Sequence, residues 1–540
     1  MESILPPGMR DQQPLQPATE DEETNELATK SPPTTEVSGD GVEEEFLDDG
    51  IAASECTATP WQPSGNWWKD FWFFSGPGWF VSIAYVDPGN YQADIQAGAT
   101  TRYYLLWAVW WTSLLSIYVQ ILCVRLAYYA QLTLAETQAR DARTKWGRYG
   151  SWLIAEFSAI ITDLPEVIGI GIACHYFFGW PYYAGVLLSL LTTMLFLATM
   201  SYGIQTLEFI IFGFVAINSL ALWLEMAFVS PSGGEIFKGW TYGFVDVTPD
   251  DIFSIAGILG AVVMPHNLYL HTAAVQSRRV KRQESIVQKA VKFSSIEPVF
   301  PIVMSFFVNM AVVSIAAESV YGSPDADGVG LTDFCTYFQT VKGGCFLWGI
   351  ALLAAGQSSA ITTTFTGQYI MDGFLDIQLP VELRAIVTRL VAITPCVIVS
   401  VLFPDRLNDL VNVVNALLSF LLPFAFTPLV KYNCSERVLG QFASKGIERV
   451  VLFTFAILVW GVNAVALSWK GGGFFGEFVP EMDWGLEKLF YVALQIAIQI
   501  CYAWWNFSTL FSEVNFFPRA IEEERPPEAQ FASSSSFVIT

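Results

Sequence analysis

Long apolar stretches separated by short polar segments follow one another from about residue 72 to residue 511. Most have close to the ~20 residues that an α-helix needs to cross the ~30 Å hydrocarbon core of a bilayer. The pattern predicts an all-α integral, multi-pass membrane protein with about twelve transmembrane helices. The expected spans are residues 72–99, 103–128, 152–176, 180–200, 207–228, 252–275, 293–317, 346–369, 383–402, 408–430, 449–468 and 486–511.

Helix-breaking residues interrupt the first and sixth spans. One contains Asp87-Pro88-Gly89-Asn90 and the other Met264-Pro265-His266-Asn267, so both read x-Pro-x-Asn. Proline lacks an amide hydrogen and crowds the preceding turn, so each helix should break there and leave backbone carbonyls without donors. Matching breaks in two halves are typical of the substrate site of a secondary transporter. Each break opens a five-span unit, residues 72–228 and 252–430, and the odd number of spans gives the two units opposite topology.

The composition excludes a soluble chain and shows where its acidity lies. Hydrophobic residues make up 53% of the chain and charged residues only 15%, which is low for a soluble protein. Of the net charge of -23, -13 lies in residues 1–60. Residues 1–65 bury too few apolar side chains to offset the entropy of ordering, so we expect a disordered acidic tail. The membrane domain then covers residues 66–511, including two extra helices in 449–511, and a second tail covers 512–540.

Basic residues in the short loops predict the orientation. The loops after spans 2, 6 and 10 carry fourteen Lys and Arg residues, whereas those after spans 5, 7, 9 and 11 carry four. The positive-inside rule places the first group, and with it both termini, in the cytoplasm. No cleavable signal peptide is recognisable, so the first span should direct insertion. The sequence does not choose between the plasma membrane and an acidic endosomal or vacuolar membrane.

The residues at the two breaks suggest a cation site. One Pro-Gly kink alone is commonly structural, but Asp87 is costly in a membrane and favours a transport path over a structural ion pair. Asp87 and Asn90 offer oxygen ligands, and the break frees the carbonyl of Ala261. Oxygen ligands suit Mg2+, Ca2+ or Mn2+, whereas the thioether of Met264 favours softer ions. A membrane methionine is usually packing, so this inference depends on the position of Met264 at the break.

These residues belong to motifs that resemble the NRAMP family of divalent metal-ion/proton symporters, over about residues 72–511. The matching motifs are Gly76-Pro77-Gly78, Asp87-Pro88-Gly89-Asn90, Gln96-Ala97-Gly98-Ala99, the stretch Asp163 to Gly169, Met264 to His271, and Gly356-Gln357-Ser358-Ser359 continuing through Gly367-Gln368.

The resemblance implies a LeuT-like inverted repeat of five spans, with helices 1 and 6 broken. It also implies that the metal ligands are Asp87, Asn90, the Ala261 carbonyl and Met264, joined by Asn415 when the site is occluded. Magnesium-specialised relatives lack the methionine. Two departures stand out: Gln92 replaces a usual acid, which would alter the outer or proton side of the site, and Pro165 replaces a usual glutamine in span 3, where it would bend the proposed proton path.

Other ionisable residues inside the spans are candidates for moving protons. Span 3 carries Glu156, Asp163 and Glu166 at spacings that share one helical face, and Arg389 in span 9 is their expected counter-charge. They read either as a structural ion-pair network or, by resemblance, as a proton path that begins at Asp87. We expect a proton or gating role for His266 and His271, and a satisfied hydrogen bond for His175. For the hydroxyl series of span 8 we expect packing between helices. Its members are Ser358, Ser359, Thr362, Thr363, Thr364 and Thr366.

The resulting hypothesis is proton-coupled secondary transport of Mn2+ or Fe2+ toward the cytoplasm by alternating access. No GxxxxGK[ST] motif and no segment large enough for a catalytic domain is present, so we expect no enzyme activity, nucleotide or cofactor. The eight cysteines show no metal-binding or disulfide spacing, although Cys335 and Cys345 are close in one loop. Expected partners are divalent ions, protons and lipid, without nucleic acid, in a monomer or weak oligomer. One alternative is the same fold specialised for another cation such as Mg2+ or a trivalent ion, and a second is a non-transporting metal sensor or scaffold. A third is an amino-acid transporter, but Asp87 would repel the carboxylate of its substrate.

Overall fold

The structure is a computed structural model that describes residues 60–517 apart from 199–203, 249–250, 325, 327, 338–342, 378–379 and 469–484. Almost all of the predicted acidic tail, and most of the tail after residue 512, lie outside the described residues. Trp61, near the end of the predicted acidic tail, is buried against Phe74 and Phe293. Its amide donates to the carbonyl of Arg279 at 3.0 Å. Ordered packing therefore begins before the first predicted span.

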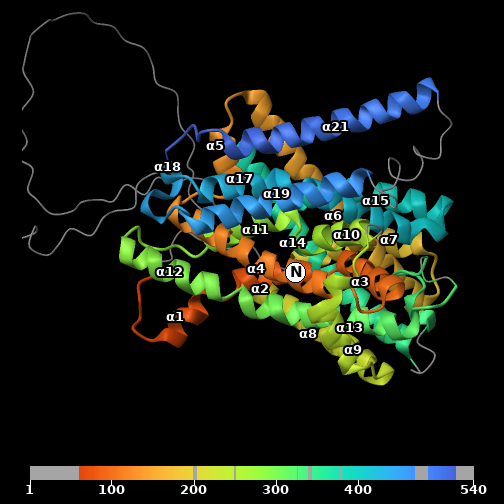
Figure 1. The fold of residues 1–540 in the computed structure, drawn as a ribbon. Helices are drawn as coiled ribbons and strands as arrows, with labels where there is room; N and C mark the ends of the chain where they lie inside the picture. Colours follow the sequence, from red (N-terminus) through yellow and green to blue (C-terminus); the bar gives the residue numbers. More distant parts are fainter. Residues whose placement is uncertain are drawn as a thin grey trace, which may run out of the picture. The chain divides into compact units, whose positions relative to one another are not determined.

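The described residues form helices joined by loops, with an isolated β-bridge between Trp61 and Val280 (Figure 1). The helices are α1 (Trp67–Phe74), α2 (Pro77–Ser82), η1 (Ile83–Tyr85), α3 (Pro88–Thr101), α4 (Leu106–Tyr129), α5 (Leu134–Asp141), α6 (Lys145–Phe178), α7 (Tyr182–Ala198), α8 (Ile204–Val229), α9 (Gly233–Tyr242), η3 (Gly243–Asp246), α10 (Ile252–Val262), α11 (Pro265–Gln276), α12 (Glu284–Ile296), α13 (Val299–Ser319), η5 (Phe334–Tyr337), α14 (Gly344–Leu375), α15 (Val381–Leu402), η6 (Pro404–Arg406), α16 (Leu407–Leu421), α17 (Pro423–Asn433), α18 (Glu436–Leu439), η7 (Gly440–Phe442), α19 (Ile447–Ser468) and α21 (Leu486–Phe511).

The predicted membrane helices are confirmed. Within the described ranges, ten helical segments are long and apolar enough to cross a bilayer. The broken first span and the shorter apolar helix α7 occupy the two remaining predicted positions. The main difference lies in the third span, where α6 begins at Lys145 and runs unbroken across Pro165 to Phe178. The additional residues at its start include Lys145 and Arg148, so apolar content alone did not mark this end.

Both predicted helix breaks are present. Helix η1 ends at Tyr85, and Asp87 has an extended backbone (φ -93°, ψ 168°) before α3 begins at Pro88. Helix α10 ends at Val262, and Met264 is likewise extended (φ -69°, ψ 132°) before α11 begins at Pro265. Each extended residue immediately precedes a proline, whose ring disfavours the helical conformation of its neighbour. The local sequence therefore accounts for both interruptions.

The broken helices lie among continuous ones. Helix α3 packs on α13 and α6, α10 packs on α16 and α4, and the long helices α6 and α14 contact each other extensively. Close approach of α3 and α6 depends on Gly169, since a Cβ there would lie 2.6 Å from Cγ of Pro88. This contact brings the first break beside the helix that carries the predicted proton-path acids.

A buried carboxylate holds the first half of the broken span in place. Glu297, at the junction of α12 and α13, accepts hydrogen bonds from the amides of Gly76, Gly78 and Trp79 at 3.0, 2.6 and 3.2 Å. These amides lie at the N-cap and in the first turn of α2, where backbone N–H groups have no acceptor inside the helix and need one from outside. Glu297 thereby fixes where α2 begins relative to α13.

We predict that Glu297→Ala destabilises the protein. The substitution leaves three amides without their acceptor in a buried position, at a cost of at least about 2 kcal/mol. The thermal unfolding midpoint in detergent should fall, whereas Glu284→Ala, at the start of α12, should leave it close to wild type. An unchanged midpoint for Glu297→Ala would show that α2 is held by other contacts.

Candidate metal site

Asp87 shapes the first break through its own carboxylate. As the N-cap of α3, its Oδ1 accepts from the amide of Asn90 at 2.7 Å and from Nδ2 of Asn90 at 2.9 Å. Its Oδ2 has no hydrogen-bond donor among the described residues. The side chain is only 1% exposed. Because a buried charged oxygen needs a donor or a cation, this atom is a strong candidate ligand.

Asn90 joins the two breaks. Its Nδ2 donates to the carbonyl of Ala84 at 2.9 Å and to the carbonyl of Ala261 at 3.0 Å. The Ala261 carbonyl is available because its usual helical donor, four residues later, is Pro265. Asp87, Asn90 and the Ala261 carbonyl, predicted from two distant motifs, are therefore brought together. Rotation of the Asn90 carboxamide by half a turn would present its Oδ1 to a cation.

The other two predicted ligand residues also lie at the breaks. Met264 is the fully buried N-cap residue of α11, three positions after Ala261. Asn415 comes from the middle of α16, and its Nδ2 donates to the carbonyl of Gly89 at 2.8 Å. Its Oδ1 has no donor within the described part of the chain. A Cβ at Gly89 would lie 3.1 Å from that oxygen, so α16 closely approaches the first turn of α3.

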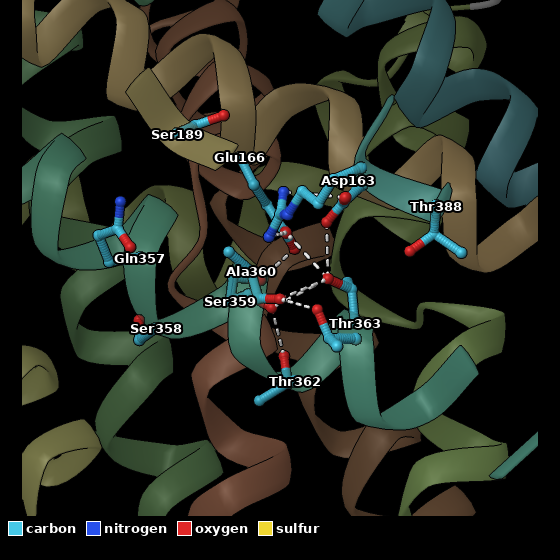
Figure 2. Close-up of polar contacts among 12 residues, drawn as sticks. Asp163, Glu166, Ser189, Gln357, Ser358, Ser359, Ala360, Thr362, Thr363 and Thr388 are labelled. Carbon is cyan, nitrogen blue, oxygen red and sulfur yellow. Dashed lines mark hydrogen bonds and ion pairs between the residues drawn. The ribbon is translucent and has the colours of Figure 1, made fainter. Parts of the chain in front are cut away.

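The predicted acids of span 3 lie on α6 and contact two other helices (Figure 2). Asp163 forms an ion pair with Arg389 of α15 at 2.8 Å, and Glu166 lies 4.0 Å from the same guanidinium. From α14, Thr363 donates to Asp163 at 2.6 Å, and Ser359 donates to Glu166. The interpretation of the span 8 hydroxyls as packing is therefore incomplete for Ser359 and Thr363.

Glu156 does not share the predicted counter-charge. It forms an ion pair with Arg384, which lies five residues before Arg389 on α15. Glu156 and Asp163 are seven residues apart on α6, and the two arginines are five residues apart on α15. Glu156 therefore pairs with Arg384, and Asp163 pairs with Arg389. Arg384 was not assigned as a counter-charge from the sequence, although it is a second cation at the start of the same predicted span as Arg389.

Comparison with known proteins identifies the family. A family model described as "Natural resistance-associated macrophage protein-like" (Nramp) matches residues 78–468. The chain belongs to the Nramp family. It is 37% identical to the metal transporter Nramp2 of Populus trichocarpa over 414 residues, covering 74% of this chain and 76% of that one. It is 36% identical to the metal transporter Nramp2 of Arabidopsis thaliana, covering 84% of each chain.

A solved structure supports the same assignment. The manganese transporter of Eremococcus coleocola, in complex with an aromatic bis-isothiourea substituted compound, is 28% identical and superposes with a TM-score of 0.73. The match covers 85% of this chain and 99% of the other. The LeuT-like architecture with broken helices 1 and 6, expected from sequence, is confirmed for this Nramp chain.

The histidines of this Nramp protein face different helices. Nδ1 of His266 lies 3.1 Å from the hydroxyl of Thr162 on α6, next to Asp163. His271 contacts Gln120 of α4 instead. Both are fully buried, whereas His175 is partly exposed and contacts the carbonyl of Trp180, as expected of a satisfied histidine. His266 therefore contacts α6, the helix that carries Asp163 and Glu166, whereas His271 contacts α4.

Sequence reasoning overlooked a further acid in the first broken helix. Asp94 lies seven residues after Asp87 and four after Asn90, on the same face of α3. It is 2% exposed, and its Oδ2 has no donor among the residues that the structure describes. The heptad spacing from Asp87 was the signal that could have revealed it.

Residues 328–337 cover α3 on the side predicted to be extracytoplasmic. Gln92 accepts from the amide of Leu331 at 2.9 Å, and Gln96 donates to the carbonyl of Val329 at 2.6 Å. Cys335 is joined to Cys345 by a disulfide, so the two cysteines that lie close together in one loop of the sequence pair, although the cysteine spacing did not predict a disulfide. Gln92, the departure from the usual acid, thus serves as an acceptor that holds the outer segment.

We predict that Gln92→Leu loosens this segment. Leucine has no acceptor, so the amide of Leu331 would lose its hydrogen bond, whereas Gln92→Glu keeps an oxygen in place. Hydrogen–deuterium exchange with mass spectrometry should show faster exchange in peptides covering residues 328–337 for the leucine variant only. Equal exchange in both variants would mean that other contacts hold the segment.

Proposed function

We propose that this protein is a secondary transporter that moves Mn2+ or Fe2+ together with protons toward the cytoplasm. Alternating access would occur around the two broken helices. The observation that carries the proposal is the junction at Asn90, whose carboxamide contacts both breaks beside the buried carboxylate of Asp87. Movement of either half-helix would change the geometry of this junction, so binding and conformation would be coupled.

The donor set supports a divalent transition metal as substrate. Oδ2 of Asp87, Oδ1 of Asn90 and Oδ1 of Asn415 lack hydrogen-bond donors within the described residues. Carboxylate, amide and carbonyl oxygens bind hard cations, and the thioether of Met264 adds a softer ligand that disfavours Ca2+ and Mg2+. The relatives named above are metal transporters, and the solved structure is that of a manganese transporter. Magnesium is the second candidate substrate, and Met264 argues against it.

The buried acids support coupling to protons. Pro88, next to Asp87, packs on Gly169 of α6, three residues from Glu166. A proton released at Asp87 would pass to Glu166 and Asp163, and then to Glu156, with Arg389 and His266 adjusting the charge along the path. A membrane potential that is negative inside adds about 2.3 kcal/mol per charge per 100 mV to the drive for cation uptake.

The remaining features of the proposal follow from the sequence. Both termini are placed in the cytoplasm, and the membrane is either the plasma membrane or that of an acidic endosomal or vacuolar compartment. The transporter works as a monomer or weak oligomer without a cofactor or enzyme activity. Its gradient-driven mechanism needs no nucleotide.

We predict that Asp87→Ala abolishes metal uptake, because it removes the charged ligand. Proteoliposomes with an internal Mn2+-sensitive dye, and a pH dye in parallel, measure both fluxes under an inward proton gradient. Wild type should import Mn2+ with acidification, and Asp409→Ala, which alters an exposed ion pair, should match it. Mn2+ uptake by Asp87→Ala would contradict the assigned ligand, and uptake by wild type without acidification would contradict coupling.

We predict that Met264→Ala retains Mn2+ transport but discriminates less against Ca2+, because the soft ligand is lost. Competition of Ca2+ with Mn2+ uptake in the same proteoliposomes measures this ratio. Met371→Ala removes another buried methionine, in α14 and not among the residues of either break, and controls for lost packing. If Met264→Ala and wild type are inhibited equally by Ca2+, the thioether does not set selectivity.

A further inference from the structure

A cluster of two carboxylates, one guanidinium and two hydroxyls lies between α6, α14 and α15 (Figure 2). Glu166 and Arg389 are fully buried, and Asp163 is 5% exposed. Figure 2 shows Ser359 and Thr363 directed toward the two acids. The hydroxyls arrive from a helix that was expected only to pack, so the cluster is built by three helices rather than two.

The charges in this cluster do not balance when both acids are ionised. Arg389 supplies one positive charge, and it lies closer to Asp163, at 2.8 Å, than to Glu166, at 4.0 Å. A buried charge without a partner is costly, so the cluster should hold one extra proton. The more weakly paired acid, Glu166, is the expected site of that proton.

The neighbouring helices add no second cation to the cluster within the described residues. On α15, Arg384 is paired with Glu156, and Cys396 contacts the carbonyl of Leu164. From α11, His266 contacts Thr162 rather than either acid. Helix α7 contributes Ser189, which donates to its own helix. The proton balance of Asp163 and Glu166 is therefore decided by Arg389 and the α14 hydroxyls.

Thr363 stands between the two carboxylates. Its Oγ1 lies 2.6 Å from Oδ1 of Asp163 and 3.2 Å from Oε2 of Glu166. A hydroxyl has one hydrogen to donate and lone pairs to accept. Thr363 can thus donate to an ionised Asp163 while accepting the O–H of a protonated Glu166. Ser359, which donates to Oε1 of Glu166, holds that carboxyl in place.

We infer that Thr363 is a proton relay between Glu166 and Asp163, a role that rests on the proposed proton coupling. In the transfer, the O–H bond of Glu166 breaks as a new one forms at Oγ1 of Thr363. The original Thr363 hydrogen passes at the same time to Oδ1 of Asp163. The cluster keeps one extra proton throughout, and rotation of the Thr363 hydroxyl resets the relay. Ser359 is a positioning residue for Glu166.

Helix α14 offers a matched control. Thr366 is also fully buried, but its hydroxyl donates to the carbonyl of Thr362 in its own helix, at 2.8 Å. Thr366→Val therefore removes a buried hydroxyl from the same helix without touching either acid. Thr363→Val makes the same change at the cluster, and Thr363→Ser restores a hydroxyl there.

The experiment measures Mn2+ uptake and acidification in proteoliposomes across a range of pH. Thr363→Val should lose about tenfold or more of its metal-driven proton flux and shift the pH profile of uptake, with the KM for Mn2+ unchanged. Thr363→Ser should recover most of the flux, and Thr366→Val should match wild type. Wild-type proton flux and an unshifted profile in Thr363→Val overturn the relay.

A second measurement covers the case in which Thr363→Val does not fold. Infrared difference spectroscopy of the purified wild type should show the stretching band of a protonated carboxyl, and Glu166→Gln should remove it. Absence of the band overturns the shared proton and the relay with it. A wild type that shows the band but imports Mn2+ without acidification contradicts the proposed coupling, whereas failure of the Thr363 variants alone to alter proton flux contradicts only the relay.

Discussion

The carboxamide of Asn90 joins the two interrupted helices, and the rest of the site depends on that contact. Proline at the start of α3 and of α11 ends the preceding helical segment and leaves carbonyls without internal donors. Nδ2 of Asn90 reaches one such carbonyl from each break, at Ala84 and Ala261. Exposed backbone carbonyls are unstable in a bilayer, so this junction has to be enclosed by protein. The surrounding helices α6, α13, α14 and α16 provide that enclosure.

Enclosure also leaves Oδ2 of Asp87 and Oδ1 of Asn415 without hydrogen-bond donors in the described part of the chain. Burial of Asp87 and Asn415 with unsatisfied oxygens costs free energy that a bound metal ion would recover. The same close packing brings Pro88 onto Gly169, so the candidate metal ligands and the acids of α6 belong to one connected core. A change in charge at Asp87 would therefore alter the electrostatic energy of the acids on α6, because the intervening distance is short and the medium has a low dielectric constant.

The two ends of the broken first span are held by different means. Glu297 accepts the free amides of α2, and Gln92 and Gln96 of α3 bind the segment 328–337. Both attachments add a few hydrogen bonds from side chains to the packing of α2 and α3 against neighbouring helices. Such contacts can be exchanged for water at a modest net cost.

The sequence by itself determined the membrane spans, both helix breaks and the residues at them, because hydrophobic length and proline act locally. Family motifs then indicated the ligand set and the acids. Only the tertiary structure decided which partners those groups meet: Glu156 pairs with Arg384, the hydroxyls of Ser359 and Thr363 serve the acids, and Gln92 holds residues 328–337. The burial of Asp94 was likewise decided by the packing of α3, although its spacing from Asp87 was visible in the sequence. The physical reason is that hydrogen bonds and ion pairs act over about 3–4 Å, so their choice depends on how distant helices pack and not on the pattern along any one of them.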